Sequence, residues 1–120
     1  MKNRSNFREL LGIELVEAKD GYAKMAMKVT ANHINALGST HGGAIFSLAD
    51  SAFAEAANSG DKTAVAIQVS INFVRPTTEG DVLIAEAVRI AEGKTFGVYS
   101  VTVSKNDKTI ALFNGLAFKQ

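Results

Sequence analysis

The feature that most constrains this chain is an almost entirely apolar stretch between Gly42 and Asn58, whose only charged residues are Asp50 and Glu55. The stretch predicts one long helix, opened by the pair Gly42-Gly43. At about 100° per residue, one side of that helix carries a continuous apolar stripe that would pack against a sheet. The stripe consists of Ile45, Leu48, Ala49, Ala52 and Ala56.

The side of the helix that carries Asp50 is small and apolar too, unlike an ordinary solvent-facing side. It holds Gly43, Phe46, Ser47, Phe53, Ala54 and Ala57. A helix that is apolar all round is buried all round, and in a chain of 120 residues one sheet can cover only one side. We therefore expect the other side to meet a second subunit, which places Asp50 near a subunit interface.

Asp50 and the start of the helix are candidates for chemistry. Burying an ionised carboxylate without partners costs several kcal/mol, so an acid in this setting needs a reason, and catalysis is a leading one. Ser39 and Thr40 are the expected N-caps. Gly42 and Gly43 let a ligand approach N–H groups that have no partner inside the helix. Such groups could stabilise an oxyanion by about 3–4 kcal/mol per donor; tight helix packing is the alternative reason for the two glycines.

Composition and charge narrow the function classes. Hydrophobic residues make up 47% and charged residues 21% of the sequence, which is ordinary for one globular domain spanning residues 1–120. The net charge of +1 and the lack of a Lys/Arg cluster argue against nucleic-acid binding. The absence of cysteine excludes disulfides, thiolate nucleophiles and Cys-ligated metals. The N-terminus lacks an apolar signal-peptide core and the charged helix residues make a poor membrane span, so we expect a cytoplasmic protein.

Alternating apolar residues and turn signals predict an antiparallel sheet around the long helix. A short helix is expected at 6–11, a loop at 32–39, and strands at 13–18, 22–30, 65–73, 82–90, 96–104 and 110–118. Asp20-Gly21 is a hairpin signal between the first two strands. Arg75-Pro76 ends the third, because proline cannot donate to a ladder. Long strands joined by tight turns predict an α+β layer pair in which the sheet curls around the helix.

The string HGGAIFSLAD, from His41 to Asp50, resembles the acyl-CoA thioesterases of the hotdog-fold superfamily, and most closely the phenylacetate-pathway (PaaI-type) subfamily. The similarity covers nearly the whole chain, because it continues in several other segments. These are Ser51–Ala54, Ala57–Ser59, Ile71–Pro76, Gly80–Asp81 and Ala111–Phe113. The resemblance implies hydrolysis of an acyl-CoA thioester to free CoA and a carboxylate, with no metal or other cofactor. It also implies a homodimer with active sites at its interface, and two dimers joined as a homotetramer.

The resemblance further implies roles for five residues. Asp50 would act as the nucleophile or as the general base for water. The backbone N–H groups of Gly42 and Gly43 would polarise the thioester carbonyl. His41 and Asn35 would position the substrate or the water.

Other residues are candidates for substrate contacts, each with a plainer alternative. Phe46 and Phe53 could line a pocket for a small aryl or short-to-medium acyl group, or could be ordinary core residues. Gln68 and Ser70 occupy the strand after the helix, where some relatives place a Ser or Thr near the attacking water.

The basic candidates are Arg75, Arg89 and Lys94, which could contact the phosphates of coenzyme A or could be ion-pairing and solvated-turn residues. Other chemistries find little support, since the sequence lacks the His spacing of a metal site and the nucleophile elbow of a serine hydrolase. Two rivals stay open: a hotdog dehydratase, which would leave the thioester intact, and a non-catalytic acyl-CoA binding module.

Overall fold

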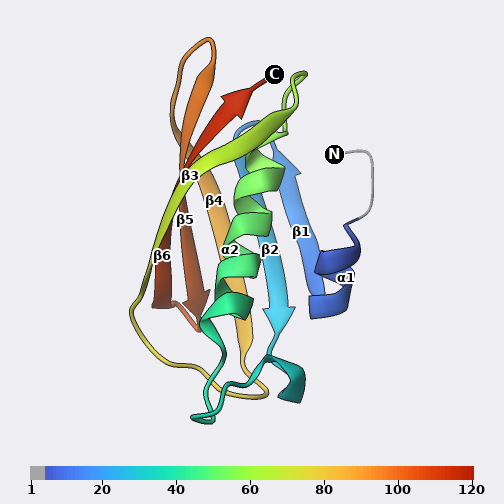
Figure 1. Cartoon of the computed structure of the whole chain (residues 1–120), viewed down its shortest axis with the longest axis vertical. Coiled ribbons are helices and arrows are strands. Elements are labelled where there is room, and N and C mark those ends of the chain that lie inside the picture. The colour runs from blue at the N-terminus through green and yellow to red at the C-terminus, as the bar shows by residue number, and fades with distance from the viewer. Residues whose placement is uncertain (1–4) are drawn as a thin grey trace.

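The computed structural model of the protein describes residues 5–120. Its elements, in chain order, are α1 (Asn6–Leu11), β1 (Ile13–Lys19), β2 (Tyr22–Lys28), the 3₁₀ turn η1 (Ala31–His33), α2 (Gly42–Ala57), β3 (Ala64–Phe73), β4 (Val82–Glu92), β5 (Phe96–Lys105) and β6 (Lys108–Lys119). The bounds of the α-helices and strands lie within two residues of the predicted ones, whereas η1 falls at the start of a predicted loop. Figure 1 shows α2 lying lengthwise against one face of the sheet, as the α+β prediction requires.

The sheet has six strands in the order β1-β2-β4-β5-β6-β3, and every pairing is antiparallel. The expectation of a tight turn is wrong between β3 and β4, because β3 pairs with β6, where Ile71 lies opposite Phe113. Residues 74–81 instead cross from the edge of the sheet to its interior. Backbone hydrogen bonds hold this crossing at both ends: the Val74 N–H donates to the Ile110 carbonyl and the Gly80 N–H to the Val29 carbonyl, both at 2.8 Å. In consequence β3 forms one edge of the sheet.

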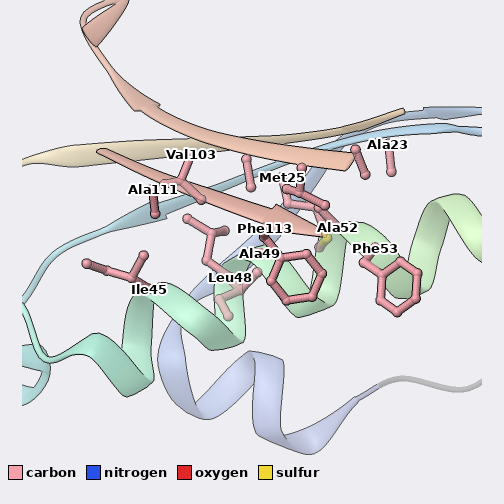
Figure 2. Close-up of a cluster of buried hydrophobic side chains, with 14 of the residues drawn as sticks. Ala23, Met25, Ile45, Leu48, Ala49, Ala52, Phe53, Val103, Ala111 and Phe113 are labelled. Atoms are coloured by element: carbon pink, nitrogen blue, oxygen red, sulfur yellow. The ribbon is translucent and has the colours of Figure 1, made fainter. Parts of the chain in front are cut away.

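The core lies between α2 and the facing side of the sheet (Figure 2). All five residues of the predicted stripe on α2 are buried. They meet inward-facing side chains of four strands, among them Met25, Leu83, Val103 and Phe113. The apolar stripe of the helix and the apolar faces of the alternating strands thus pack against one another in a single core. Within residues 5–120, no helix combines the length and the hydropathy needed to span a bilayer.

Phe53 departs from its predicted place on the Asp50 side of the helix. Its side chain is 1% exposed, with ring centroids 5.6 Å from Tyr99 and 5.7 Å from Phe113. The ring lies over Gly115 of β6, where a Cβ atom would come within 2.7 Å of the Phe53 Cζ atom. The missing side chain at Gly115 makes room for this large residue, so Phe53 turns towards the sheet.

The short helix α1 covers part of the opposite side of α2. Arg8 anchors it: one guanidinium nitrogen contacts the Glu55 carboxylate at 2.6 Å, and the other donates to the Ser51 carbonyl at 3.1 Å. Both side chains of this ion pair are largely buried, at 16% and 13% exposure. The α1 helix of the same chain therefore covers part of the α2 side that we expected a second subunit alone to cover.

Candidate active site

The start of α2 is capped by His41, which corrects the expectation of Ser39 or Thr40. The backbone of His41 is extended, and its Nδ1 atom accepts a hydrogen bond from the Gly43 N–H at 2.8 Å. Thr40 stands one residue before the cap, and its buried hydroxyl is engaged elsewhere, since it accepts a hydrogen bond from Thr77 at 2.7 Å. The cap is thus an imidazole nitrogen in place of the usual hydroxyl or carboxylate.

Because of this cap, the N–H groups of Gly42 and Gly43 differ in whether they can bind a ligand. The Gly43 N–H is already bonded to His41, whereas the Gly42 N–H has no acceptor within residues 5–120. Only the amide of Gly42 is therefore ready to bind an oxyanion. Because Nδ1 of His41 accepts, the proton of its neutral ring must sit on Nε2, which makes the exposed edge of the ring a donor.

Asp50 lies in the middle of α2 and is half-buried. It lines a cavity of about 290 Å³ together with Phe7 and Arg8 from α1 and Phe46 from its own helix. Burial raises the pKa of the Asp50 carboxyl above its ordinary value, and the positive charge of Arg8 opposes part of that rise. The site thus holds a poorly solvated carboxylate, and such a group is a stronger base than one in water.

A second cavity, of about 450 Å³, adjoins the first and shares Phe7 and Phe46 with it. His41, Gly43 and His33 also line it. His33 is buried, and both its ring nitrogens are engaged. Nδ1 accepts from the Thr30 N–H at 3.0 Å, and Nε2 bonds the Leu11 carbonyl at 2.9 Å. His33 therefore serves the loop structure, and the ring of His41 is the one open to a ligand.

Gly42 lies on a third cavity, of about 330 Å³, that is also lined by Phe73, Arg75 and Pro76. A Cβ atom at Gly42 would lie 3.1 Å from the Phe73 Cζ atom. The small residue thus lets the Phe73 ring close over the start of the helix. The cavity combines an open backbone donor with an apolar wall, which is a usual make-up for a ligand site.

Within one chain, the structure does not bring Gly42 and Asp50 to the same point. They stand eight residues apart on one helix, which at 1.5 Å per residue is about 12 Å. An oxyanion donor and an attacking group must both lie within about 3 Å of the same reacting carbonyl. One copy of α2 therefore cannot supply both groups to one substrate.

Asn35 organises the loop before α2. Its side-chain oxygen accepts from the Leu37 N–H at 2.9 Å and from the Ser39 N–H at 3.1 Å. Its amide nitrogen makes only a long contact of 3.3 Å to the Ser39 hydroxyl. The side chain is therefore held with its oxygen occupied and its N–H groups the better placed to meet a ligand.

The other predicted contact residues lie in different places. Gln68 and Ser70 are exposed on the edge strand β3. Arg75 borders the Gly42 cavity and donates to the Thr109 carbonyl at 2.6 Å. Arg89 contacts both carboxylate oxygens of Asp20, at 3.1 and 3.2 Å.

Arg89 also lines a cavity with residues that follow the C-terminal end of α2, such as Ser59 and Lys62. Lys94 lies in the β4–β5 turn, which Figure 1 shows at that same end of the molecule. Both basic residues are therefore remote from Gly42 of their own chain. No three His, Asp or Glu side chains of residues 5–120 are grouped closely enough to hold a metal ion.

Sequence reasoning missed Phe7 and Arg8, which line the Asp50 cavity. Their place depends on the contact between α1 and α2, and the Arg8–Glu55 ion pair joins positions 47 residues apart. The one available signal was Glu55, because a carboxylate on a buried apolar helix needs a positively charged partner.

Comparison with known proteins identifies the family. The model of the thioesterase superfamily matches residues 37–111. Acyl-coenzyme A thioesterase PaaI of Escherichia coli is 46% identical over 106 residues, which are 88% of this chain and 76% of that protein. Acyl-coenzyme A thioesterase 13 of Homo sapiens is 32% identical over 107 residues, 87% of this chain and 76% of that protein.

Solved structures agree with these sequence matches. The PaaI protein of Escherichia coli superposes with a TM-score of 0.95 at 41% identity, over 98% of this chain and 86% of that one. The smu.793 protein of Streptococcus mutans, solved bound to acetyl CoA, gives a TM-score of 0.88 at 26% identity, over 100% of this chain and 93% of that one. The chain therefore belongs to the thioesterase superfamily, as a PaaI-type thioester hydrolase with the hotdog fold.

Proposed function

We propose that the protein hydrolyses acyl-CoA thioesters at a composite site, in which Gly42 of one subunit and Asp50 of a second copy act on the same carbonyl. The observation that carries this proposal is the separation of about 12 Å between the two groups on one helix. Two α2 helices lying antiparallel would place the start of each beside the middle of the other. The CoA thioester as substrate is supported by the two relatives named as acyl-coenzyme A thioesterases and by the acetyl CoA in the Streptococcus structure.

The sheet offers a surface for such a dimer. β3 is an edge strand, and apolar side chains on it are exposed, including Val65, Ile67 and Phe73. Natural proteins avoid leaving a long apolar edge strand open, because it pairs with other strands. Pairing of β3 with β3 of a second copy would extend the sheet and bring the two α2 helices together. Two such dimers would form the expected homotetramer.

The chemistry follows from the groups present. The Gly42 N–H donates to the thioester oxygen as negative charge develops on it. Asp50 either attacks the carbonyl carbon, expelling the CoA thiolate and leaving an anhydride that water cleaves, or takes a proton from the water that attacks. In both routes the C–S bond breaks, and the products are a carboxylate and free CoA thiol. His41, through Nε2–H, and the amide of Asn35 orient the carbonyl or the water.

The acyl group has a matching cavity beside Asp50. Phe46 borders both cavities on this side of α2, and Phe7 of α1 also lines both. Two aromatic walls around about 290 Å³ suit a small aryl or a short-to-medium aliphatic group. Phe53 lies in the core and does not border either of these cavities.

Release of free thiol from a panel of acyl-CoAs tests the reaction. The panel should include arylacetyl, benzoyl and aliphatic thioesters of increasing length. We expect wild type to turn over some members and Asp50→Asn to be at least about 100-fold slower, the usual contribution of a general base or nucleophile. Binding without thiol release would contradict hydrolysis, and hydration of an enoyl-CoA with the thioester intact would indicate a dehydratase.

A mixing experiment tests whether the site is composite. Gly42→Pro removes the N–H at the first position of a helix, where proline is well tolerated, and His41 before it is already extended. Gly42→Ala is the matched control, because it adds the same Cβ near Phe73 and keeps the N–H. We expect Gly42→Pro and Asp50→Asn each to be inactive alone. Equal mixing and subunit exchange should restore about a quarter of wild-type activity, because each mixed C2 dimer regains one intact site. No recovery despite exchange would refute a shared site.

A further inference from the structure

The Arg8–Glu55 ion pair lies beside Asp50. Ser51 and Glu55 stand one turn apart on α2 and therefore share a face of the helix. The Arg8 guanidinium spans them: one terminal nitrogen contacts the Glu55 carboxylate at 2.6 Å, and the other donates to the Ser51 carbonyl at 3.1 Å. Asp50 directly precedes Ser51, and both line the cavity of about 290 Å³ that Arg8 also lines. The ion pair thus belongs to the immediate surroundings of the proposed reactive carboxylate.

Arg8 and Asp50 share this cavity but are not paired with each other. Within residues 5–120, the Asp50 carboxylate makes no ion pair and accepts no hydrogen bond. Both terminal nitrogens of Arg8 are engaged by Glu55 and Ser51. The two side chains of the ion pair are largely buried, so their charges are only weakly screened by salt and water. Asp50 is therefore exposed to the field of a cation that a different carboxylate holds in place.

The other titratable groups around Asp50 are few. Glu9 of α1 does not line the cavity, and within residues 5–120 no strand contributes to its lining. His33 borders the neighbouring cavity with both ring nitrogens engaged. In the proposed dimer, His41 of a second copy is the further titratable group that comes close. Burial raises the pKa of Asp50, and the charge of Arg8 opposes part of that rise. Within one chain, the ion pair is therefore the main electrostatic influence on this carboxylate.

We propose that Arg8 and Glu55 are positioning residues for thioester hydrolysis: Glu55 keeps the guanidinium close enough to favour ionised Asp50, and stops it from pairing with Asp50. This inference rests on the proposed function of Asp50. A half-buried carboxylate without a nearby cation takes up a proton more readily, and protonated Asp50 could neither attack the thioester nor accept a proton from water. A carboxylate paired directly with a guanidinium has its oxygens occupied by hydrogen bonds. The observed arrangement avoids both of these unreactive states.

Two variants should move the acid limb of the pH profile of kcat/KM in opposite directions, because that limb reports ionisation of the essential base in the free enzyme. Glu55→Gln leaves the charge of Arg8 unopposed. We expect it to lower the limb by about one pH unit and to reduce kcat at neutral pH about threefold, because a weaker base reacts more slowly. The double variant Arg8→Met with Glu55→Leu removes both charges and keeps the space filled. It should raise the limb by about half a pH unit.

A control and a second measurement accompany the pH profile. Lys19→Met removes a charge from the exposed ion pair with Glu17, outside the cavity, and should leave the acid limb in place. Carbon NMR of the Asp50 carboxyl group, assigned by comparison with Asp50→Asn, measures its titration without turnover. The same opposite shifts are expected there, so the inference stays testable in a variant that is inactive.

An acid limb and an NMR titration that stay in place, or that move in the same direction in both variants, would overturn the inference. A lower melting temperature with an unchanged titration would show that the ion pair only anchors α1. If wild type releases no thiol from any acyl-CoA while the NMR titrations shift in opposite directions, the proposed function fails and the electrostatic coupling stands. The two failures are therefore distinguishable.

Discussion

Replacing Gly115 of β6 by alanine should destabilise the protein through one residue of α2. A Cβ at this position would lie 2.7 Å from the Phe53 Cζ atom, whereas carbon atoms pack at about 3.5–4.0 Å. The ring would have to retreat by roughly 1 Å, but Tyr99 and Phe113 flank it with centroids at 5.6 and 5.7 Å. Overpacking of this kind costs about 1–3 kcal/mol, and alanine returns about 0.5–1 kcal/mol by restricting the unfolded chain. The net loss in the free energy of unfolding should be about 1–2 kcal/mol.

Urea denaturation followed by circular dichroism, at one fixed protein concentration, measures this loss. Gly115→Ala should lower the urea midpoint by roughly 0.5–1 M. Gly60→Ala is the control: its added Cβ would meet nothing within 4 Å, so this change keeps only the gain from restricting the unfolded chain and should not lower the midpoint. Combining Gly115→Ala with Phe53→Leu should cost less than the sum of the two single changes, because the smaller side chain vacates the contested space.

Two results would refute this reasoning. The first is additivity of Gly115→Ala and Phe53→Leu, which would mean that the ring and the glycine do not share the space. The second is a change in acyl selectivity by Phe53→Leu at unchanged stability. That result would return Phe53 to the substrate pocket that the sequence suggested and that we propose Phe46 and Phe7 to line.

Three further predictions concern the site and the sheet. Because burial raises the folded-state pKa of Asp50, its ionisation destabilises the fold; Asp50→Asn should be more stable than wild type at pH 7 in urea, with a gap that closes as the pH falls towards about 4. Phe7→Ala should lower kcat/KM about tenfold for aryl and longer acyl-CoAs but not for acetyl-CoA, whereas Leu10→Ala, on the same helix but on neither cavity, should change neither value. Tyr22 donates to Glu86 at 2.7 Å, which raises the pKa of Tyr22 to about 12. An absorbance titration should show this raised pKa, and Glu86→Gln should return it towards 10. An unchanged titration in Glu86→Gln would exclude the hydrogen bond to Glu86 as the cause.

The sequence could predict what depends on neighbours along the chain. The stripe on α2 follows from spacing within one helix, and the alternation in β2 or β5 follows from spacing within one strand. Pairing of β3 with β6 could not be predicted in this way, because a residue such as Ile71 gives no local sign that its partner is Phe113, 42 positions later.

In the candidate site, too, local features could be predicted from the sequence and features that depend on distant contacts could not. Asp50 and Gly42 could be singled out as candidates because an acid in an apolar helix and a glycine pair are unusual in themselves. The cap by His41 was missed because imidazole is a rare N-cap and because the hydroxyl of Thr40, the obvious choice, is taken by Thr77. Phe53 was assigned to the wrong side because the helical wheel does not show the vacant space above Gly115.

The anchoring of α1 by Arg8 has a consequence for temperature. A helix of six residues is far too short to hold its shape alone in water, and α1 contributes no buried side chain to the core. It should therefore come away from α2 in a local opening well below the temperature at which the sheet unfolds. Phe7 of α1 lines the proposed acyl cavity. On warming, the enzyme should therefore lose its discrimination among acyl groups before it loses its ability to hydrolyse the thioester.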